Sequence, residues 1–336
     1  MNLMKTIRKS FSARLSLQVV MIASMVFGVV FSVLFFSSKR IVRQEAESHA
    51  GSELSGTVYQ IEDILHQVEA AAKNMEWLVR DRLGNPDSLY AVTRMMMRTN
   101  PHVIGSCVAF EPGFYAEKGE LFAPYSYLTE EGEVKDRNLG YAAYNYHAKE
   151  WYATPKRLDR NYWSEPYFDE GGGDRVMSTY SHVLRNGEGK MFGILTADIS
   201  LDHLSGLVNG IKPYPGSYTL MISRLGNYLV HPKPERILHE TIYTATSDMT
   251  DRSVTILGDA MIRGEEGMHE LQNDDTLSYV FYKPVEGTEW SVAVVCPYRD
   301  VFAPLDRLTL VVVSVFLLGL LALLFFCVWR IRRTSH

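Results

Sequence analysis

The sequence has few of the residues and motifs on which catalysis or metal binding usually depends. Three of its 336 residues are cysteines, and Cys327 lies in a long apolar run, which leaves Cys107 and Cys296 outside that run. Neither of these two belongs to a C-x-x-C pair, so we expect two buried free thiols and no disulfide framework. The motif H-E-x-x-H, a spaced Cys/His set and a phosphate-binding loop are also missing. The sequence therefore predicts no catalytic residue, no metal and no cofactor.

The charge balance points away from nucleic acid and leaves one enzymatic alternative. The formal net charge is -5 at pH 7, so no basic surface for a nucleic-acid partner is indicated. A hydrolase built on Asp169 and Asp198 is a minor alternative, weakened because neither a nucleophile nor a metal site accompanies the two acids. We therefore predict that the chain is not an enzyme.

Two long apolar runs, from about Leu15 to Phe36 and from about Leu308 to Trp329, stand near the ends of the chain. Each approaches the roughly 20 residues that an α-helix needs to cross a bilayer. Basic residues precede the first run and follow the second, and no Asp or Glu occurs before Glu45. Both tails are therefore expected in the cytoplasm. The prediction is a two-pass protein of the bacterial cytoplasmic (inner) membrane, in contact with membrane lipid, with residues 38–305 outside the cytoplasm.

The domain boundaries follow from these runs and from the change of pattern between them. We expect seven segments: a cytoplasmic tail (1–14), an uncleaved transmembrane helix (15–37), a long helix (38–82), a membrane-distal sheet domain (83–205), a membrane-proximal sheet domain (206–305), a second transmembrane helix (306–329) and a cytoplasmic tail (330–336).

The long helix carries a regular apolar seam. Eight apolar residues alternate in steps of four and three: Leu54, Val58, Ile61, Leu65, Val68, Ala72, Met75 and Val79. Such a heptad pattern is typical of a helix that packs along a second surface. Either the helix packs on its own domain, or the part near the membrane pairs with the same helix of a second subunit. We favour the second interpretation and predict a homodimer through the long helix.

Beyond residue 103 the pattern changes to strands and turns. The glycine-rich run Glu170–Gly173 predicts a hairpin between two of the strands. Two similar series end in the same way, because the strands Phe192–Asp198 and Trp290–Cys296 are each followed by a helix. This repeat predicts two antiparallel sheet domains stacked on one long helix, which is an α+β fold. The expected strands are 103–110, 125–128, 167–169, 175–184, 191–199, 218–223, 228–231, 277–284 and 290–295.

Aromatic and charged residues are concentrated between Tyr141 and Asp169. Aromatic walls with a few polar groups are typical of pockets that bury small organic ligands. The alternative is a core with polar caps, since Trp and Tyr also serve as large packing residues with one wet end. Composition does not choose between these two. The cluster consists of Tyr144, Tyr146, Lys149, Trp151, Tyr152, Tyr162, Trp163, Tyr167 and Asp169.

The chain resembles a double Cache (dCache) extracytoplasmic sensor. The resemblance lies in the order of its parts: an anchor, a long helix, two sheet domains and a second apolar run. Chemoreceptors, sensor histidine kinases, diguanylate cyclases and SpoIIE-type phosphatases carry such sensors. The resemblance extends from about Lys39 to Leu305, and the runs Trp163–Gly173 and Met177–Ser181 are similar to the distal-domain segment of these sensors. It implies two stacked PAS-like sheet domains, of which the distal one binds the ligand.

Amino-acid-binding members of this family share a Tyr, then Arg-x-Trp-Tyr, then a later Asp. This chain has Lys149 where the family has arginine, which replaces two parallel hydrogen bonds to a carboxylate by a point charge. The resemblance implies a site for an amino acid or a related amine. Its implied residues are Tyr144, Lys149, Trp151, Tyr152, Tyr167, Asp169 and Asp198.

The chemistry of these residues suits such a ligand. Lys149 and the Trp151 indole N–H could hold a carboxylate, while Asp169 and Asp198 could receive an ammonium group beside the faces of neighbouring tyrosines. Three alternatives stay open: an amine without a carboxylate as the ligand, Asp198 as the cap of the following helix, and Lys149 facing solvent.

The expected function is that of a membrane-anchored sensor whose signal crosses the membrane. Because residues 330–336 alone follow the second apolar run, three arrangements compete. The chain is the sensor region of a longer receptor, or it signals through a separate cytoplasmic or membrane partner, or it binds a ligand without signalling. A scaffold, packed solid around Trp151, is the structural alternative.

Overall fold

The computed structural model describes residues 11–141, 143–244, 252–273 and 276–334. The predicted N-terminal tail as far as residue 10, and the last two residues of the predicted C-terminal tail, lie outside this part. The chain divides into two compact units. Met1–His49 and Pro297–His336 form the helix-pair unit, and Ala50–Cys296 form the sheet unit.

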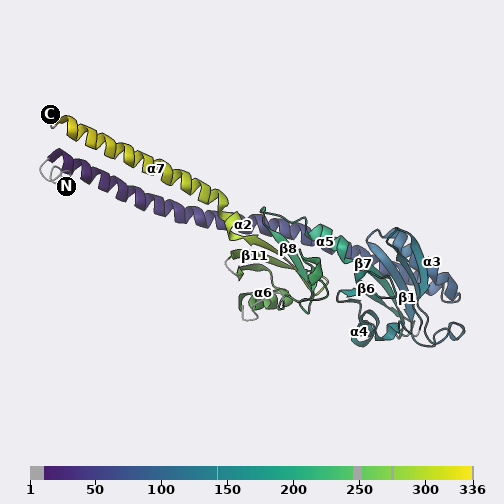
Figure 1. The fold of residues 1–336 in the computed structure, drawn as a ribbon. Coiled ribbons are helices and arrows are strands. Elements are labelled where there is room, and N and C mark those ends of the chain that lie inside the picture. The colour runs from purple at the N-terminus through teal and green to yellow at the C-terminus, as the bar shows by residue number, and fades with distance from the viewer. Residues whose placement is uncertain (1–10, 142, 245–251, 274–275, 335–336) are drawn as a thin grey trace. The chain divides into compact units, whose positions relative to one another are not determined.

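Two long helices make up the helix-pair unit. Helix α2 spans Phe11–Asp81, continuing into the sheet unit, and α7 spans Tyr298–Thr334. Both are long and apolar enough to cross a membrane, by length and composition. In this unit they lie side by side, with the start of α2 and the end of α7 at the same end of the pair (Figure 1), and the ring centroids of Phe27 and Phe316 are 3.5 Å apart in a stacked arrangement. This arrangement agrees with the predicted two-pass topology.

The predicted seam of α2 is occupied within the chain itself. Seven of its eight residues are buried, from Leu54 to Val79, and Met75 is partly buried. On the same helix, Glu69 accepts a hydrogen bond from Trp163 of the first sheet, and Glu62 accepts one from the backbone N–H of Glu286 beside the second. The helix therefore packs on its own sheets, and the interpretation that this seam pairs with a second subunit is wrong. A homodimer remains a prediction, and it would need another surface.

The first sheet is antiparallel and has seven strands. Its order is β3-β2-β1-β7-β6-β4, with β5 pairing on β6. Helix α3 packs on β1 and β2, and α4 packs on β6. The elements are α3 (Leu89–Thr99), β1 (Val103–Phe110), β2 (Pro124–Leu128), β3 (Val134–Asn138), α4 (Glu150–Leu158), β4 (Tyr162–Trp163), β5 (Tyr167–Phe168), β6 (Val176–Arg185) and β7 (Met191–Ser200).

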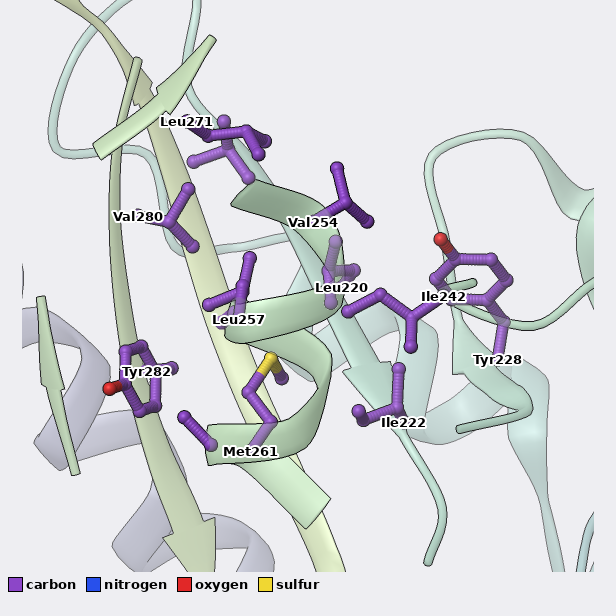
Figure 2. Close-up of a cluster of buried hydrophobic side chains, with 13 residues drawn as sticks. Leu220, Ile222, Tyr228, Ile242, Val254, Leu257, Met261, Leu271, Val280 and Tyr282 are labelled. Atoms are coloured by element: carbon purple, nitrogen blue, oxygen red, sulfur yellow. The ribbon is translucent and has the colours of Figure 1, made fainter. Parts of the chain in front are cut away.

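The second sheet has five antiparallel strands in the order β10-β11-β12-β8-β9. Its core is shown in Figure 2, where Leu257 and Met261 of α6 lie among side chains of the strands, including Ile222 and Val280. The elements are α5 (Leu201–Val208), β8 (Tyr218–Ile222), β9 (Tyr228–Val230), α6 (Arg252–Ile262), β10 (Gly267–Asn273), β11 (Thr276–Val285) and β12 (Trp290–Pro297). Short 3-10 turns occupy Pro86–Ser88, Ala116–Lys118, Tyr146–Ala148 and Pro234–Arg236.

The predicted fold class is confirmed, because one long helix carries two antiparallel sheets. The glycine-rich hairpin is also present, since Tyr167 of β5 pairs with Met177 of β6. The predicted free thiols Cys107 and Cys296 are both buried, and neither is in a disulfide. The sequence pattern did not predict α3, α4, α6, β3, β4 and β10. Strand β3, with the sequence VKDRN, has no apolar alternation to reveal it, because it is almost wholly exposed.

Candidate functional site

Two buried carboxylates, Asp169 and Asp198, form the centre of the candidate site. Asp198 lies on β7, between Gly105 of β1 and Thr179 of β6 in the ladder. Asp169 directly follows β5 and begins the glycine-rich turn. The two residues are 2% and 3% exposed. A buried carboxylate is costly unless it is hydrogen-bonded or paired with a cation, so the partners of each acid matter.

A chain of hydroxyl groups ends on Asp198. Thr179 Oγ1 donates to Asp198 Oδ1 at 2.8 Å, and Tyr167 Oη lies 2.7 Å from the same threonine oxygen. Because the threonine proton is used on the carboxylate, Tyr167 is the donor in the second bond. Gly105 makes room for this group, since a Cβ there would come within 2.5 Å of Asp198 Oδ2 and 2.4 Å of Tyr125 Oη.

The glycine-rich turn and a tyrosine hold Asp169. The Tyr144 hydroxyl donates to Asp169 Oδ1, and the Gly173 N–H donates to Oδ2 at 2.7 Å. A Cβ on Gly172 would stand 1.9 Å from Oδ2. The glycines of this hairpin therefore serve two purposes, because they form the turn and they allow the backbone to close on a carboxylate.

The electrostatics of the pair favour the arrival of a cation. Burial raises the pKa of Asp169. Burial, and then the charge of Asp169, raise the pKa of Asp198 to about 7. The proximity of Lys149 acts in the opposite direction on the Asp169 pKa. A positively charged group between the two acids would stabilise both ionised forms.

Lys149 and Trp151 lie at the start of α4, close to Tyr144. The Lys149 ammonium lies 4.7 Å from the centre of the Tyr144 ring, so this half-buried side chain turns toward the cluster. Trp151 is buried, and its Nε1–H has no hydrogen-bond partner within the described part of the chain. Burial, and then the charge of Asp169, raise the pKa of the Tyr144 hydroxyl, while the nearby indole acts in the opposite direction without forming a hydrogen bond. Buried N–H groups without an acceptor are rare in folded proteins.

Tyr152 has a different environment from the other predicted site residues. Its hydroxyl donates to Glu111 Oε1 at 2.7 Å, and Lys156 pairs with the other oxygen of Glu111. Its ring packs edge-on against Tyr146. The structure therefore brings six of the seven predicted residues into one cluster and places the Tyr152 hydroxyl on a separate ion pair, where it positions α4.

The capping alternative for Asp198 is wrong. Helix α5 begins at Leu201, and the residue before it, Ser200, accepts a hydrogen bond from the Asp202 N–H at 3.2 Å. Ser200 therefore caps the helix, and Asp198 stays in the sheet interior.

Three residues of the cluster were missed by the sequence analysis: Gly105, Tyr125 and Thr179. The Tyr125 hydroxyl is buried without a hydrogen-bond partner among the described residues. These residues come from β1, β2 and β6, so no local spacing joins them to the acids. Their positions follow from strand order, which the sequence pattern does not reveal.

The acids are closely packed in this structure. A cavity of about 510 Å3 exists in the sheet unit, but none of the seven predicted residues lines it. A ligand at Asp169 would share this carboxylate with Tyr144 and the Gly173 N–H. Among the described residues, no group of three or more His, Cys, Asp or Glu is placed to hold a metal.

Part of the sequence is similar to bacterial chemotaxis receptors. Residues 89–206 match the family model described as methyl-accepting chemotaxis protein-like, first PDC sensor domain. The methyl-accepting chemotaxis protein PscA of Pseudomonas syringae pv. tomato is 27% identical over 170 residues, which cover 49% of this chain and 25% of that protein. The chain thus spans about a quarter of the length of this curated relative.

Solved structures agree with the sheet arrangement. The extracellular domain assigned to the histidine kinase soHK1S-Z6 superimposes with a TM-score of 0.66 at 22% identity, covering 80% of this chain and 99% of that one. The ligand-binding domain of the Pseudomonas aeruginosa chemoreceptor PctB, in complex with L-Gln, has a TM-score of 0.55 at 18% identity and covers 79% and 98%. The fold predicted from the sequence is confirmed, and within it residues 89–206 resemble the first sensor domain of methyl-accepting chemotaxis proteins.

Proposed function

We propose, from the premise that this chain carries an extracytoplasmic sensor region of the double Cache type, that it detects a small ammonium-bearing molecule outside the cytoplasm. The ligand is an amino acid or a related amine. The two apolar helices anchor the region in the bacterial inner membrane and carry the signal across it.

The observation that carries the proposal is the pair of buried carboxylates, Asp169 and Asp198. Their charges repel one another, and burial disfavours both ionised forms, so the pKa of Asp198 rises to about 7. An ammonium group would relieve both penalties through charge-assisted hydrogen bonds. Tyrosine rings beside the acids add cation–π attraction.

The second half of the proposed site recognises a carboxylate. The indole N–H of Trp151 is a buried donor with no acceptor among the described residues, and Lys149 supplies a positive charge beside the neighbouring Tyr144 ring. A ligand carboxylate would satisfy both. In support, the similar domains of PctB and Mlp24 have been solved with L-Gln and with asparagine.

Signalling requires the ligand to prefer one arrangement of the protein over another. In the ligand-free arrangement Tyr144 donates to Asp169, and a bound ammonium would compete with it for that carboxylate. Binding would then loosen Tyr144 and shift the start of α4. We propose that this change acts through a homodimer and through a cytoplasmic or membrane signalling partner, or through further parts of a longer receptor.

The test is a thermal-shift screen of the full chain in lipid nanodiscs against amino acids, amines and small carboxylates. A ligand that binds only the folded state raises the melting temperature by mass action. We expect a shift with an amino acid that is lost in Asp198→Asn and in Trp151→Phe, which removes the N–H and keeps an aromatic ring. Asp81→Asn, an exposed change of the same charge on α2, is the matched control.

The pattern of the screen separates the alternatives. A shift with amines alone, unaffected by Trp151→Phe, would assign the site to an amine without a carboxylate. Unchanged melting with every compound would sink the proposal and favour a scaffold. Recovery of a chemically altered ligand would instead support the hydrolase alternative.

A further inference from the structure

The sheet unit contains a cavity whose lining residues are separate from the candidate site. The cavity of about 510 Å3 lies wholly in the sheet unit, and its walls come from α2, the first sheet and two turns of the second sheet. Its lining includes Glu69 of α2, Trp163 of β4, Arg224 of the β8–β9 turn and Trp290 of β12. Its volume is in the range of small-molecule pockets, roughly 300–1,000 Å3.

Aromatic rings form the inner wall of this cavity. The centroids of Trp163 and Trp290 are 5.5 Å apart in an edge-to-face arrangement, and Trp163 also lies 5.2 Å from Tyr180. The side chains of all three residues are nearly buried. Clustered aromatic faces attract organic cations through the ring quadrupole.

A carboxylate without a cationic partner borders these rings. Glu69 Oε1 accepts a hydrogen bond from Trp163 Nε1 at 2.8 Å. Within the described residues no ion pair joins Glu69 to a basic side chain. The second oxygen of this carboxylate is therefore available to a ligand, next to the tryptophan that would contact the same ligand.

The basic residues of the lining do not offset this negative charge. Arg224 is covered by three carboxylates, at 3.1 Å from Glu165, 3.0 Å from Glu289 and 3.4 Å from Glu150. Arg160, the other basic residue of the lining, is exposed. Two carboxylates, Glu69 and Glu289, and two guanidinium groups line the cavity, but Glu150 and Glu165 outside the lining further offset the charge of Arg224. The carboxylate of Glu69 therefore favours a positively charged occupant.

We propose that this cavity is a second ligand site, which takes a small organic ammonium cation of the quaternary or primary class. Glu69 pairs with the charge, and Trp163, Tyr180 and Trp290 surround its carbon atoms. Because the walls come from both sheets, the bound cation contacts both and holds them in one arrangement. The proposal does not depend on the function proposed for Asp169 and Asp198.

The experiment titrates the full chain in nanodiscs with choline and with putrescine, and follows tryptophan fluorescence. We expect saturable binding of at least one of them, weakened about tenfold by Glu69→Gln, which is the effect of losing one charge-assisted contact. Glutamine retains an acceptor for Trp163, so this change removes the charge and spares the fold. Glu188→Gln, in the exposed β6–β7 turn, is the matched control and should bind as the parent does.

A second variant shows whether the cation binds in the cavity or at the pair of buried acids. Asp198→Asn disables the distal pair of acids, and binding that persists in it belongs to the cavity. Three results would overturn the proposal: no saturation by either cation up to about 10 mM, equal affinity of the Glu69→Gln protein, or loss of binding in Asp198→Asn. Binding of succinate in place of both cations would likewise show that Arg160 governs the cavity.

Discussion

The charge of Asp198 should destabilise the ligand-free protein at neutral and alkaline pH. The folded-state pKa is about 7, whereas an unfolded aspartate titrates near its ordinary value of 3.8. Between these values the folded state binds a proton that the unfolded state does not. The free energy of unfolding therefore increases as the pH falls from 7 toward 4, and it loses this contribution as the pH rises through 7.

The magnitude follows from the displacement of the pKa. Each unit corresponds to about 1.4 kcal/mol, and the folded-state carboxyl is already half protonated at pH 7, so lowering the pH from 7 to 5 should stabilise the folded state by roughly 2.3 kcal/mol through this group. Asparagine has nearly the same shape and cannot ionise. Asp198→Asn should therefore be more stable than the parent protein at pH 8, and the difference should shrink as the pH is lowered.

Urea unfolding of the full chain in nanodiscs, followed by tryptophan fluorescence from pH 5 to pH 8, measures this effect. The difference between the two proteins isolates the aspartate from every other titrating group. Because Asp169 interacts with Asp198, the midpoint of the difference belongs to the pair. Parallel pH profiles for the two proteins would refute the reasoning, since Asp198 would then carry no displaced pKa.

Two further predictions concern the turn and α4. Gly172→Ala should destabilise the sheet unit by about 1–3 kcal/mol, because its Cβ would collide with Asp169; Gly187→Ala, where the Cβ meets open space, is the urea-unfolding control. Tyr152→Phe should cost about 1 kcal/mol through the lost bond to Glu111 and leave ligand affinity within twofold by calorimetry. A larger fall in affinity would place Tyr152 in the ligand site.

Much of the architecture is encoded in short-range pattern. The apolar spacing of α2 and the strong β-formers of β1, β6 and β7 reveal these elements without any tertiary information. The seam of α2 shows the limit of such patterns. A heptad spacing specifies that one face is covered, but the cover can be a second helix or the protein's own sheets, and the apolar residues are the same in either case.

The candidate site was predictable in part for a related reason. Asp169 and the glycines that close on it are neighbours in sequence, so a local motif describes them. Thr179 reaches Asp198 through strand pairing between β6 and β7, and Gly105 reaches it through β1. Such contacts depend on strand order and register. Helix α4 was missed because its aromatic residues and Pro155 resemble a pocket lining more than a regular helix.

The ion pairs of the Arg224 guanidinium also limit where chimeric sensors can be joined. Its partners include Glu150 and Glu165 beside the first sheet and Glu289 beside the second. A chimera joined near residue 206 would take this cation away from Glu165, which is 9% exposed, and leave a buried charge uncompensated. The exchangeable module is therefore the whole of Ala50–Cys296, and receptors built by grafting one sheet alone should express poorly.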